Sequence, residues 1–244
     1  MRKVGILILI LIVSWSCEKS ESTTTTSNNM GESGSLARFT IAGDHLYAVN
    51  GSRLKVFDLQ FSPAANFVGE YDYRNNIRTI FKRDSLTLFL ADLSGIKIID
   101  LSIPGEPQLM GISHEGSSCF PMVADENHAY VSVRSSRKNR LCRGDKDKLA
   151  VLDISDPIRP IPDTSYAMAS PTGLALYGDT LLLCDDGIKI LDISDVHDVQ
   201  EINHLKELEA QDIIARDSLI IVSARTGVYQ YLYKQGELKL LSRI

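Results

Sequence analysis

Short runs of apolar and β-branched residues recur along this chain at a nearly constant interval. Residues 54–58 read Leu-Lys-Val-Phe-Asp, and related segments end at positions 100, 153, 192 and, in a degraded form, 232, so the steps are 42, 53, 39 and 40 residues. Short strands that repeat at such a period predict a β-propeller in which each repeat is one four-stranded blade.

Polar turns precede these strands at matching positions, as in Gly43-Asp44 and Gly178-Asp179. Apolar runs of three or four residues flank each turn, which predicts hairpins rather than helices. A further turn and a fourth strand follow each recurring Asp. The expected fold is therefore an all-β, five-bladed ring. Its blades, each with strands a to d, span approximately 35–73, 74–116, 117–168, 169–209 and 210–244.

The third repeat is longer than the others because of one connection. The distance from the turn between strands a and b to the end of strand c is 26 residues in this repeat and 13 to 16 in the rest. The additional length falls between strands b and c, at residues 134–148. Since loops can grow on a surface while blades keep their size, we expect a long loop here.

The first residues have the composition of an export signal. Two positive charges precede an apolar run at 4–13, which is too short to span a bilayer. Residues 14–17, Ser-Trp-Ser-Cys, resemble a bacterial lipobox, which implies a signal peptide at 1–16 and a lipid on Cys17; ordinary cleavage and an uncleaved anchor are the alternatives. Residues 17–34 are polar and predict a flexible tether. The acidic residues after Cys17 resemble the export signals of Bacteroidetes surface lipoproteins.

Chain length and net charge limit the number of domains and the classes of ligand. Residues 35–244 are numerous enough for one domain of five blades. The net charge of −5 gives no electrostatic support for nucleic-acid binding.

Three further cysteines remain for an oxidising compartment. Cys119 precedes the third blade and Cys142 lies in its long loop, and the connections that carry them emerge on the same face of a propeller. We therefore expect a Cys119–Cys142 disulfide, with two unpaired thiols as the alternative. Cys184, at the end of a predicted strand, is expected to be a small buried apolar residue.

The repeated strands resemble the LVIVD repeat, as in residues 96–102 (Ile-Lys-Ile-Ile-Asp-Leu-Ser). The cysteine placement over residues 34–244 is similar to that of LVIVD-repeat lipoproteins of Bacteroidetes. The resemblance implies a propeller in the cell envelope, supports the disulfide and a structural Cys184, and implies no reaction. Relatives often have Asp after the first cysteine and a His-Gly pair opening the fourth blade, where this chain has Phe120 and Thr172-Gly173.

Polar residues are expected to gather on the upper rim, which we define as the starts of the inner strands a together with the turns between strands b and c. A central funnel with arginines and carboxylates can bind a glycan or a peptide, although charged residues in solvent are the plainer interpretation. The candidates are Arg38, Arg78, Asp92, Asp185, Gln211, Asp212 and Arg225. The recurring Asp58, Asp100, Asp153 and Asp192 lie at the opposite face, where each is expected to close its own turn.

The long loop of the third blade is strongly basic. Seven positive residues accompany Asp145 and Asp147, so the segment can dock an anionic partner or can serve only solubility. The candidate docking residues are Arg134, Arg137, Lys138, Arg140 and Arg143.

Three of the turns between strands a and b, on the face opposite the upper rim, read Asp, then Ser or Thr, then Leu. They resemble the O-glycosylation sites of Bacteroidetes, although turn chemistry alone also favours Asp-Ser. The candidate acceptors are Ser85, Thr180 and Ser218.

No pattern of catalysis, cofactor binding or metal binding appears, and the five histidines share no ligand spacing. The sequence favours an outer-membrane lipoprotein, on the periplasmic side or the cell surface, whose propeller binds a glycan or an envelope protein. A glycan-active hydrolase or lyase that uses Asp92, Asp185 or Asp212, and a scaffold subunit of an outer-membrane complex, are the alternatives.

Overall fold

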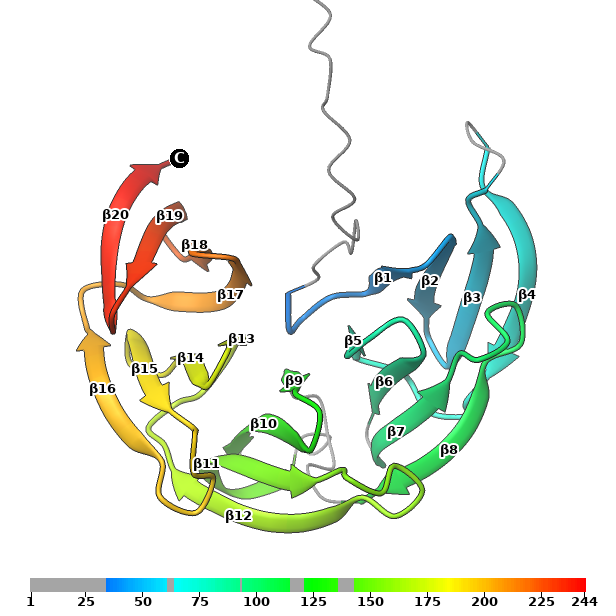
Figure 1. Ribbon diagram of the computed structural model, residues 1–244, viewed down its shortest axis with the longest axis horizontal. Coiled ribbons are helices and arrows are strands. Elements are labelled where there is room, and N and C mark those ends of the chain that lie inside the picture. Colours follow the sequence, from blue (N-terminus) through cyan, green and yellow to red (C-terminus); the bar gives the residue numbers. More distant parts are fainter. Residues whose placement is uncertain (1–33, 61–63, 93, 115–120, 136–142) are drawn as a thin grey trace, which may run out of the picture.

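The computed structural model of the protein describes residues 34–60, 64–92, 94–114, 121–135 and 143–244, with the backbone alone at 143–145. Its twenty strands form five antiparallel sheets of four, each in sequence order from the innermost to the outermost strand (Figure 1). The all-β, five-bladed class predicted from the repeats is therefore confirmed. The predicted signal peptide, most of the predicted tether and Cys17 lie outside the described residues.

The strand bounds agree with the repeat pattern. The first sheet has β1 (Phe39–Ala42), β2 (His45–Asn50), β3 (Arg53–Asp58) and β4 (Asn66–Asp72). The second has β5 (Thr79–Lys82), β6 (Thr87–Asp92), β7 (Gly95–Asp100) and β8 (Gln108–Ser113). The third has β9 (Met122–Ala124), β10 (His128–Ser135), β11 (Arg143–Asp153) and β12 (Ile161–Ala167). The fourth has β13 (Leu174–Tyr177), β14 (Thr180–Cys184), β15 (Ile188–Asp192) and β16 (Gln200–Leu205). The fifth has β17 (Ala210–Arg216), β18 (Leu219–Ala224), β19 (Gly227–Lys234) and β20 (Glu237–Arg243).

The recurring aspartates close turns, as their positions predicted. The backbone N–H of Ser102 donates to Asp100 at 2.8 Å, and that of Ser194 donates to Asp192 at 2.9 Å. Asp58 and Asp153 accept the equivalent bonds in their own sheets. A bulge between the third and fourth strands also recurs in all five sheets. The repeat is thus preserved down to single hydrogen bonds.

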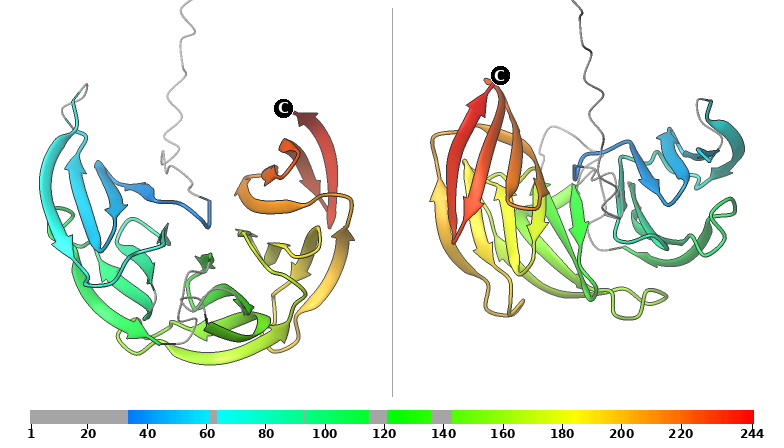
Figure 2. Two further views of the ribbon diagram at one scale, coloured as in Figure 1. Left: turned by 180° about the vertical axis from the view of Figure 1, so that it is seen from behind. Right: turned by 45° about the horizontal axis from the view of Figure 1, so that its top comes forward.

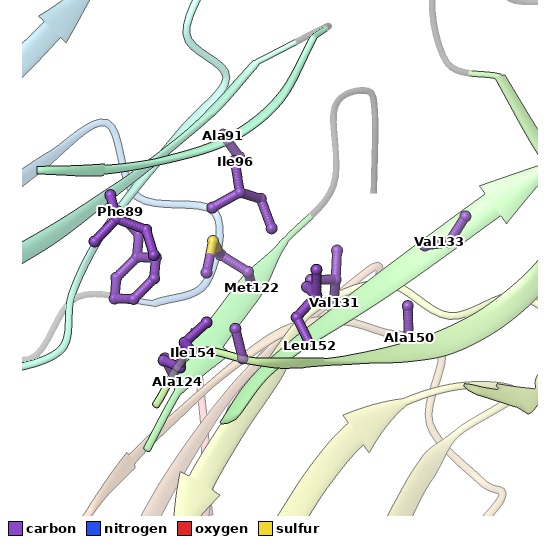
Figure 3. Packing of buried hydrophobic residues seen from close by; sticks show 12 residues of the cluster. Phe89, Ala91, Ile96, Met122, Ala124, Val131, Val133, Ala150, Leu152 and Ile154 are labelled. Atoms are coloured by element: carbon purple, nitrogen blue, oxygen red, sulfur yellow. The ribbon is translucent and has the colours of Figure 1, made fainter. Parts of the chain in front are cut away.

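The core lies between neighbouring sheets. In Figure 3, Phe89 and Ile96 of the second sheet face Met122 and Val131 of the third, and all four are at most 2% exposed. Equivalent layers join the first sheet to the second, the third to the fourth and the fourth to the fifth. Cys184 lies in the last of these layers at 1% exposure, where burial raises the pKa of its thiol far above the ordinary value. This confirms its expected role as a buried apolar residue.

The five sheets form an open arc rather than the closed ring expected from the repeats. Figures 1 and 2 show the fifth sheet, with the C-terminus, standing apart from the first sheet. The chain enters at the centre of the arc. There the hydroxyl of Ser35 donates to Asp212 at 2.8 Å and accepts from the backbone N–H of Leu174 at 3.0 Å, so residues 34–36 contact the fourth and fifth sheets before β1 begins.

The long connection of the third sheet is partly strand. β11 begins at Arg143, and Ser135 of β10 pairs with it, so the hairpin extends into the segment expected to be a loop at 134–148. The reason is that the two flanking strands continue their hydrogen-bond ladder beyond the point where the other sheets turn. Arg137, Lys138 and Arg140 of the predicted docking set lie outside the described residues, as do Cys119 and Cys142.

Candidate functional site

The predicted arginines of the upper rim lie immediately before two neighbouring inner strands, β1 and β5. The backbone N–H of Ile80 donates to the carbonyl of Ala37 at 3.1 Å, which joins the start of β1 to β5. Arg38 follows Ala37 in the chain, and Arg78 lies two residues before Ile80. Arg38 is exposed, and Arg78 is half-buried with its Nε atom buried and without a hydrogen-bond partner. Neither arginine forms an ion pair within the described residues.

The carboxylate of Asp92 on this rim already has a counter-charge within the chain. It is the last residue of β6, and its carboxylate pairs with the ammonium of Lys97 on β7. The side chains of Asp92 and Lys97 are 0% and 7% exposed. The backbone N–H of Ser94 donates to the other carboxylate oxygen at 2.6 Å. Although a lysine stem can lie along a sheet with its ammonium in solvent, the buried carboxylate attracts this ammonium inward.

Asp185 has the same arrangement in the fourth sheet. The ammonium of Lys189 lies 3.0 Å from its Oδ2 atom, and the backbone N–H of Ala169 donates to Oδ1 at 3.0 Å. Burial acts to raise the pKa of Asp185, but the hydrogen bonds from the backbone N–H of Ser170, from Lys189 and from Ala169 together hold that pKa below its ordinary value. Both rim carboxylates are therefore charged partners of strand lysines.

Asp212 occupies a different environment at the inner end of the fifth sheet. Burial raises the pKa of its carboxyl group, against the hydrogen bonds from the Ser35 hydroxyl and from the backbone N–H groups of Ile213 and Leu36. Gly173 lies so close that a Cβ atom there would be 2.4 Å from the Cα of Asp212. The preceding residue, Gln211, accepts a backbone hydrogen bond from Gly173. The N-terminal segment thus covers this carboxyl group.

The pH dependence of stability is expected to reveal this carboxyl group. A raised pKa means that the native state takes up a proton at a higher pH than the unfolded chain does. The stability of the wild type relative to Asp212→Asn should therefore rise as the pH falls from 7 toward the ordinary Asp value of about 3.9. Urea unfolding of both proteins at several pH values measures this difference. Asp192→Asn is the control, since backbone and side-chain hydrogen bonds from Ser194 lower the pKa of Asp192; a flat or falling difference for Asp212→Asn would contradict the expectation.

Arg225 is paired on the surface. Its guanidinium forms a two-point ion pair with Glu209, and both side chains are 67% exposed. Of the predicted rim set, Arg38 and Arg78 therefore precede strands that adjoin each other, and Gln211 and Asp212 lie together on β17. Asp92, Asp185 and Arg225 each have a charged partner of their own.

The predicted modification turns and the basic segment keep their polar character. Ser85 is exposed in a turn where Asp84 accepts from the backbone N–H of Leu86, while the Thr180 hydroxyl lies 3.2 Å from that of Tyr233 and Ser218 is half-buried. Arg134 is exposed at the end of β10. An open hollow of about 400 Å³ lies nearby on β11 and β12, lined in part by Lys148, Asp163 and Ser165.

Two histidines meet at one carboxylate, which no spacing in the sequence indicated. The Nε2 atoms of His128 and His197 lie 3.9 and 3.7 Å from the two oxygens of Asp163. They come from different repeats, so only the packing of the third sheet on the fourth brings them together. Within the described part of the chain, no group of three or more His, Cys, Asp or Glu side chains is arranged to hold a metal ion. No helix in that part is long and apolar enough to cross a membrane.

Comparison with known families gives a match in the third repeat. The family profile described as LVIVD repeat matches residues 141–167, which contain all of β11 and β12. The chain carries an LVIVD repeat. No curated protein matches the sequence.

Solved structures share the fold at low sequence identity. A provisional 6-phosphogluconolactonase of Bacteroides fragilis is 12% identical with a TM-score of 0.61, and the match covers 84% of this chain and 69% of that one. A Lactobacillus plantarum protein is 11% identical with a TM-score of 0.65, covering 82% and 67%. PorZ, a surface component of the type-IX secretion system of Porphyromonas gingivalis, is 18% identical with a TM-score of 0.53, covering 83% of this chain and 27% of PorZ. At these identities the likeness concerns the architecture.

Proposed function

We propose that this protein is a binding module of the cell envelope that recognises an acidic ligand at its upper rim and catalyses no reaction. One observation carries the proposal. Asp92 and Asp185 each have a lysine partner, whereas Arg38 and Arg78 have no carboxylate partner within the described residues and immediately precede the adjoining strands β1 and β5. A guanidinium without a carboxylate partner in its own chain can donate its accessible N–H groups to a carboxylate or phosphate group of a ligand.

Hydrolysis or lyase chemistry at the same carboxylates is a weaker interpretation. A general acid and base need carboxyl groups that reach a substrate and exchange protons with it. The hydrogen bonds and lysine at Asp185 favour its permanently charged form, and the Ser35 segment covers Asp212. These contacts support binding rather than turnover as the role of the rim.

A titration of the protein with acidic polysaccharides tests the proposal. Polygalacturonate and alginate are the probes, with neutral dextran as the comparison. Arg78→Ala is expected to weaken binding about ten-fold or more, because a hydrogen bond between charged groups contributes about 1.5–3 kcal/mol. The matched control is Arg53→Ala, since Arg53 is exposed and already paired with Glu70 at 2.7 Å. Equal affinity of Arg78→Ala and the wild type, or cleavage of the probe that is lost in Asp92→Asn, would contradict the proposal.

The location in the envelope rests on Cys17 and the segment before it. A lipid on Cys17 would hold the sheets at a membrane through the tether at 17–34. The Cys17→Ala variant should therefore appear in the soluble fraction of cells that retain the wild type in their membranes. Retention of the variant in the membrane fraction would contradict a lipid anchor on Cys17.

A further inference from the structure

The two outer strands of the third sheet carry a hollow that is separate from the upper-rim arginines. It has a volume of about 400 Å³ and lies on β11 and β12; we call it the outer-strand hollow. This volume falls within the range of about 300–1,000 Å³ that is typical of small-molecule sites. Its lining includes Lys148, Ala150, Pro162, Asp163, Thr164 and Ser165.

Two small residues at one cross-strand pair distinguish the third sheet from the other four. Ala150 of β11 pairs with Ser165 of β12. The five sheets can be aligned on the bulge that they share between their third and fourth strands. At this position the other sheets have large pairs: Lys55 with Glu70, Lys97 with Ile112, Lys189 with His204 and Tyr229 with Arg243. The third sheet therefore lacks the side chains that cover its outer strands elsewhere in the chain.

A change in charge accompanies this change in size. In the second and fourth sheets the strand lysine pairs with a carboxylate at the end of the second strand, Asp92 or Asp185. The third sheet has Val133 at that position, cross-strand from Lys148, whereas Gly95 is the cross-strand partner of Asp92. The third sheet has thus exchanged an internal ion pair for a lysine at the border of an open hollow.

The charged groups of the lining lie toward opposite ends. Lys148 and Ser165 are diagonal neighbours, because Lys148 pairs with Ala167 and Ala150 pairs with Ser165. Such positions are about 7–8 Å apart, which is within reach of a long side chain. Asp163 lies at the bulge opposite residues 151 and 152, about 10–13 Å along the strand from position 148. A ligand that fills the hollow therefore meets an ammonium group at one end and a carboxylate at the other.

The surroundings of Asp163 favour a hydroxyl group rather than a second ammonium group at that end. The Nε2 atoms of His128 and His197 lie 3.9 and 3.7 Å from its two oxygens. A neutral hydroxyl can donate to the carboxylate without bringing another positive charge beside two imidazoles that can themselves become protonated. Thr164 and Ser165 add hydroxyl groups to the lining, and these can both donate and accept.

We infer that the outer-strand hollow binds an acidic sugar of one or two residues. The ligand carboxylate accepts a charge-assisted hydrogen bond from Lys148, and ligand hydroxyls bond to Asp163 and to the hydroxyl groups beside it. This second site goes beyond the proposed acidic-ligand site, which lies just before β1 and β5, and neither site depends on the other.

Isothermal titration of the full-length chain with Arg38→Ala and Arg78→Ala tests the inference, because this protein lacks both upper-rim arginines. Digalacturonate is the ligand, and its uncharged dimethyl ester is the matched comparison. We expect the ester to bind about ten-fold more weakly or worse. Adding Lys148→Met should weaken the binding of digalacturonate by a similar factor and leave that of the ester unchanged. Lys146→Met is the control, since this exposed lysine lies two residues away on β11.

A second variant tests the hollow by filling it. Ser165 is exposed on the outermost strand, so Ser165→Trp should leave the fold intact, which urea unfolding checks. We expect this variant to weaken the binding of both digalacturonate and its ester by about ten-fold or more, because the indole occupies the space of the sugar. Ile112→Trp is the matched control, since Ile112 is 39% exposed at the equivalent position of the second sheet.

Four results would overturn the inference. They are the absence of saturable binding, equal affinity for the acid and its ester, tighter binding of the cationic glucosamine disaccharide, and equal losses in Ser165→Trp and Ile112→Trp. All of these measurements use a protein without the upper-rim arginines, so they do not decide the proposed function. That proposal is decided by the effect of Arg78→Ala alone on polysaccharide binding.

Discussion

Replacing Lys97 with methionine is expected to lower the free energy of unfolding by about 3–5 kcal/mol. The variant leaves the fully buried carboxylate of Asp92 without its counter-charge, and among the described residues Ser94 alone continues to donate to it. A buried unpaired charge is among the most destabilising single changes in a folded protein. Urea unfolding followed by the circular dichroism of the sheets measures the difference.

The chain contains a matched control at the same strand position. Lys55 of β3 corresponds to Lys97 of β7, but its side chain is 36% exposed and its ammonium lies 3.6 Å from Glu70. Lys55→Met should therefore cost no more than about 1 kcal/mol. Adding Asp92→Asn to Lys97→Met should recover much of the loss, since the second change removes the unpaired charge. Equal costs for Lys97→Met and Lys55→Met would show that the buried pair does not stabilise the sheet.

The number and positions of the strands could be predicted because each repeat carries its own local sequence signals for them. The acidic residue after the third strand and the polar turn before the second recur in sequence, and both depend on local hydrogen bonds such as that from Ser102 to Asp100. Local chemistry of this kind needs no knowledge of neighbouring repeats, which is why the strand pattern was confirmed in all five sheets.

The buried ion pairs have a signal in the sequence that emerges when the repeats are compared with one another. Lys97 and Lys189 occupy the third strand in repeats whose preceding turn contains Asp92 and Asp185. In the first repeat the lysine accompanies Asn50 and stays half-exposed, and in the third repeat Ala150 takes the lysine position. Comparing repeats position by position therefore indicates which carboxylates are paired, whereas their placement near a rim does not.

Closure of the ring could not be predicted from the number of repeats. The angle between neighbouring sheets depends on the volumes of the side chains between them, such as Phe89 against Met122, and five repeats do not specify the sum of those angles. The contact of Ser35 with Asp212 joins residues 177 positions apart, which no local pattern reveals. The open arc, and the covering of Asp212, are consequences of this long-range packing.

Leucine-to-alanine changes at equivalent positions of different sheets are expected to show which sheets are covered by a neighbour. The measured quantity is the loss of free energy of unfolding. Leu88 and Leu181 occupy the same site in the second and fourth sheets, and both are 0% exposed. Each substitution should lower the free energy of unfolding by about 2–5 kcal/mol, because it removes a buried side chain and leaves a cavity. Leu46 occupies this site in the first sheet, where no sheet covers it, so Leu46→Ala should cost only about 1 kcal/mol.

The comparison uses the isolated protein, in which no described sheet covers the outer face of the first sheet, where Leu46 lies. Leu46 and Leu88 are both second-strand residues paired with the third strand, so differences in strand propensity cancel between them. Unfolding in urea at one pH gives the three free energies. A cost for Leu46→Ala equal to that for Leu88→Ala would mean that the outer face of the first sheet is covered in solution, which would contradict the open arc.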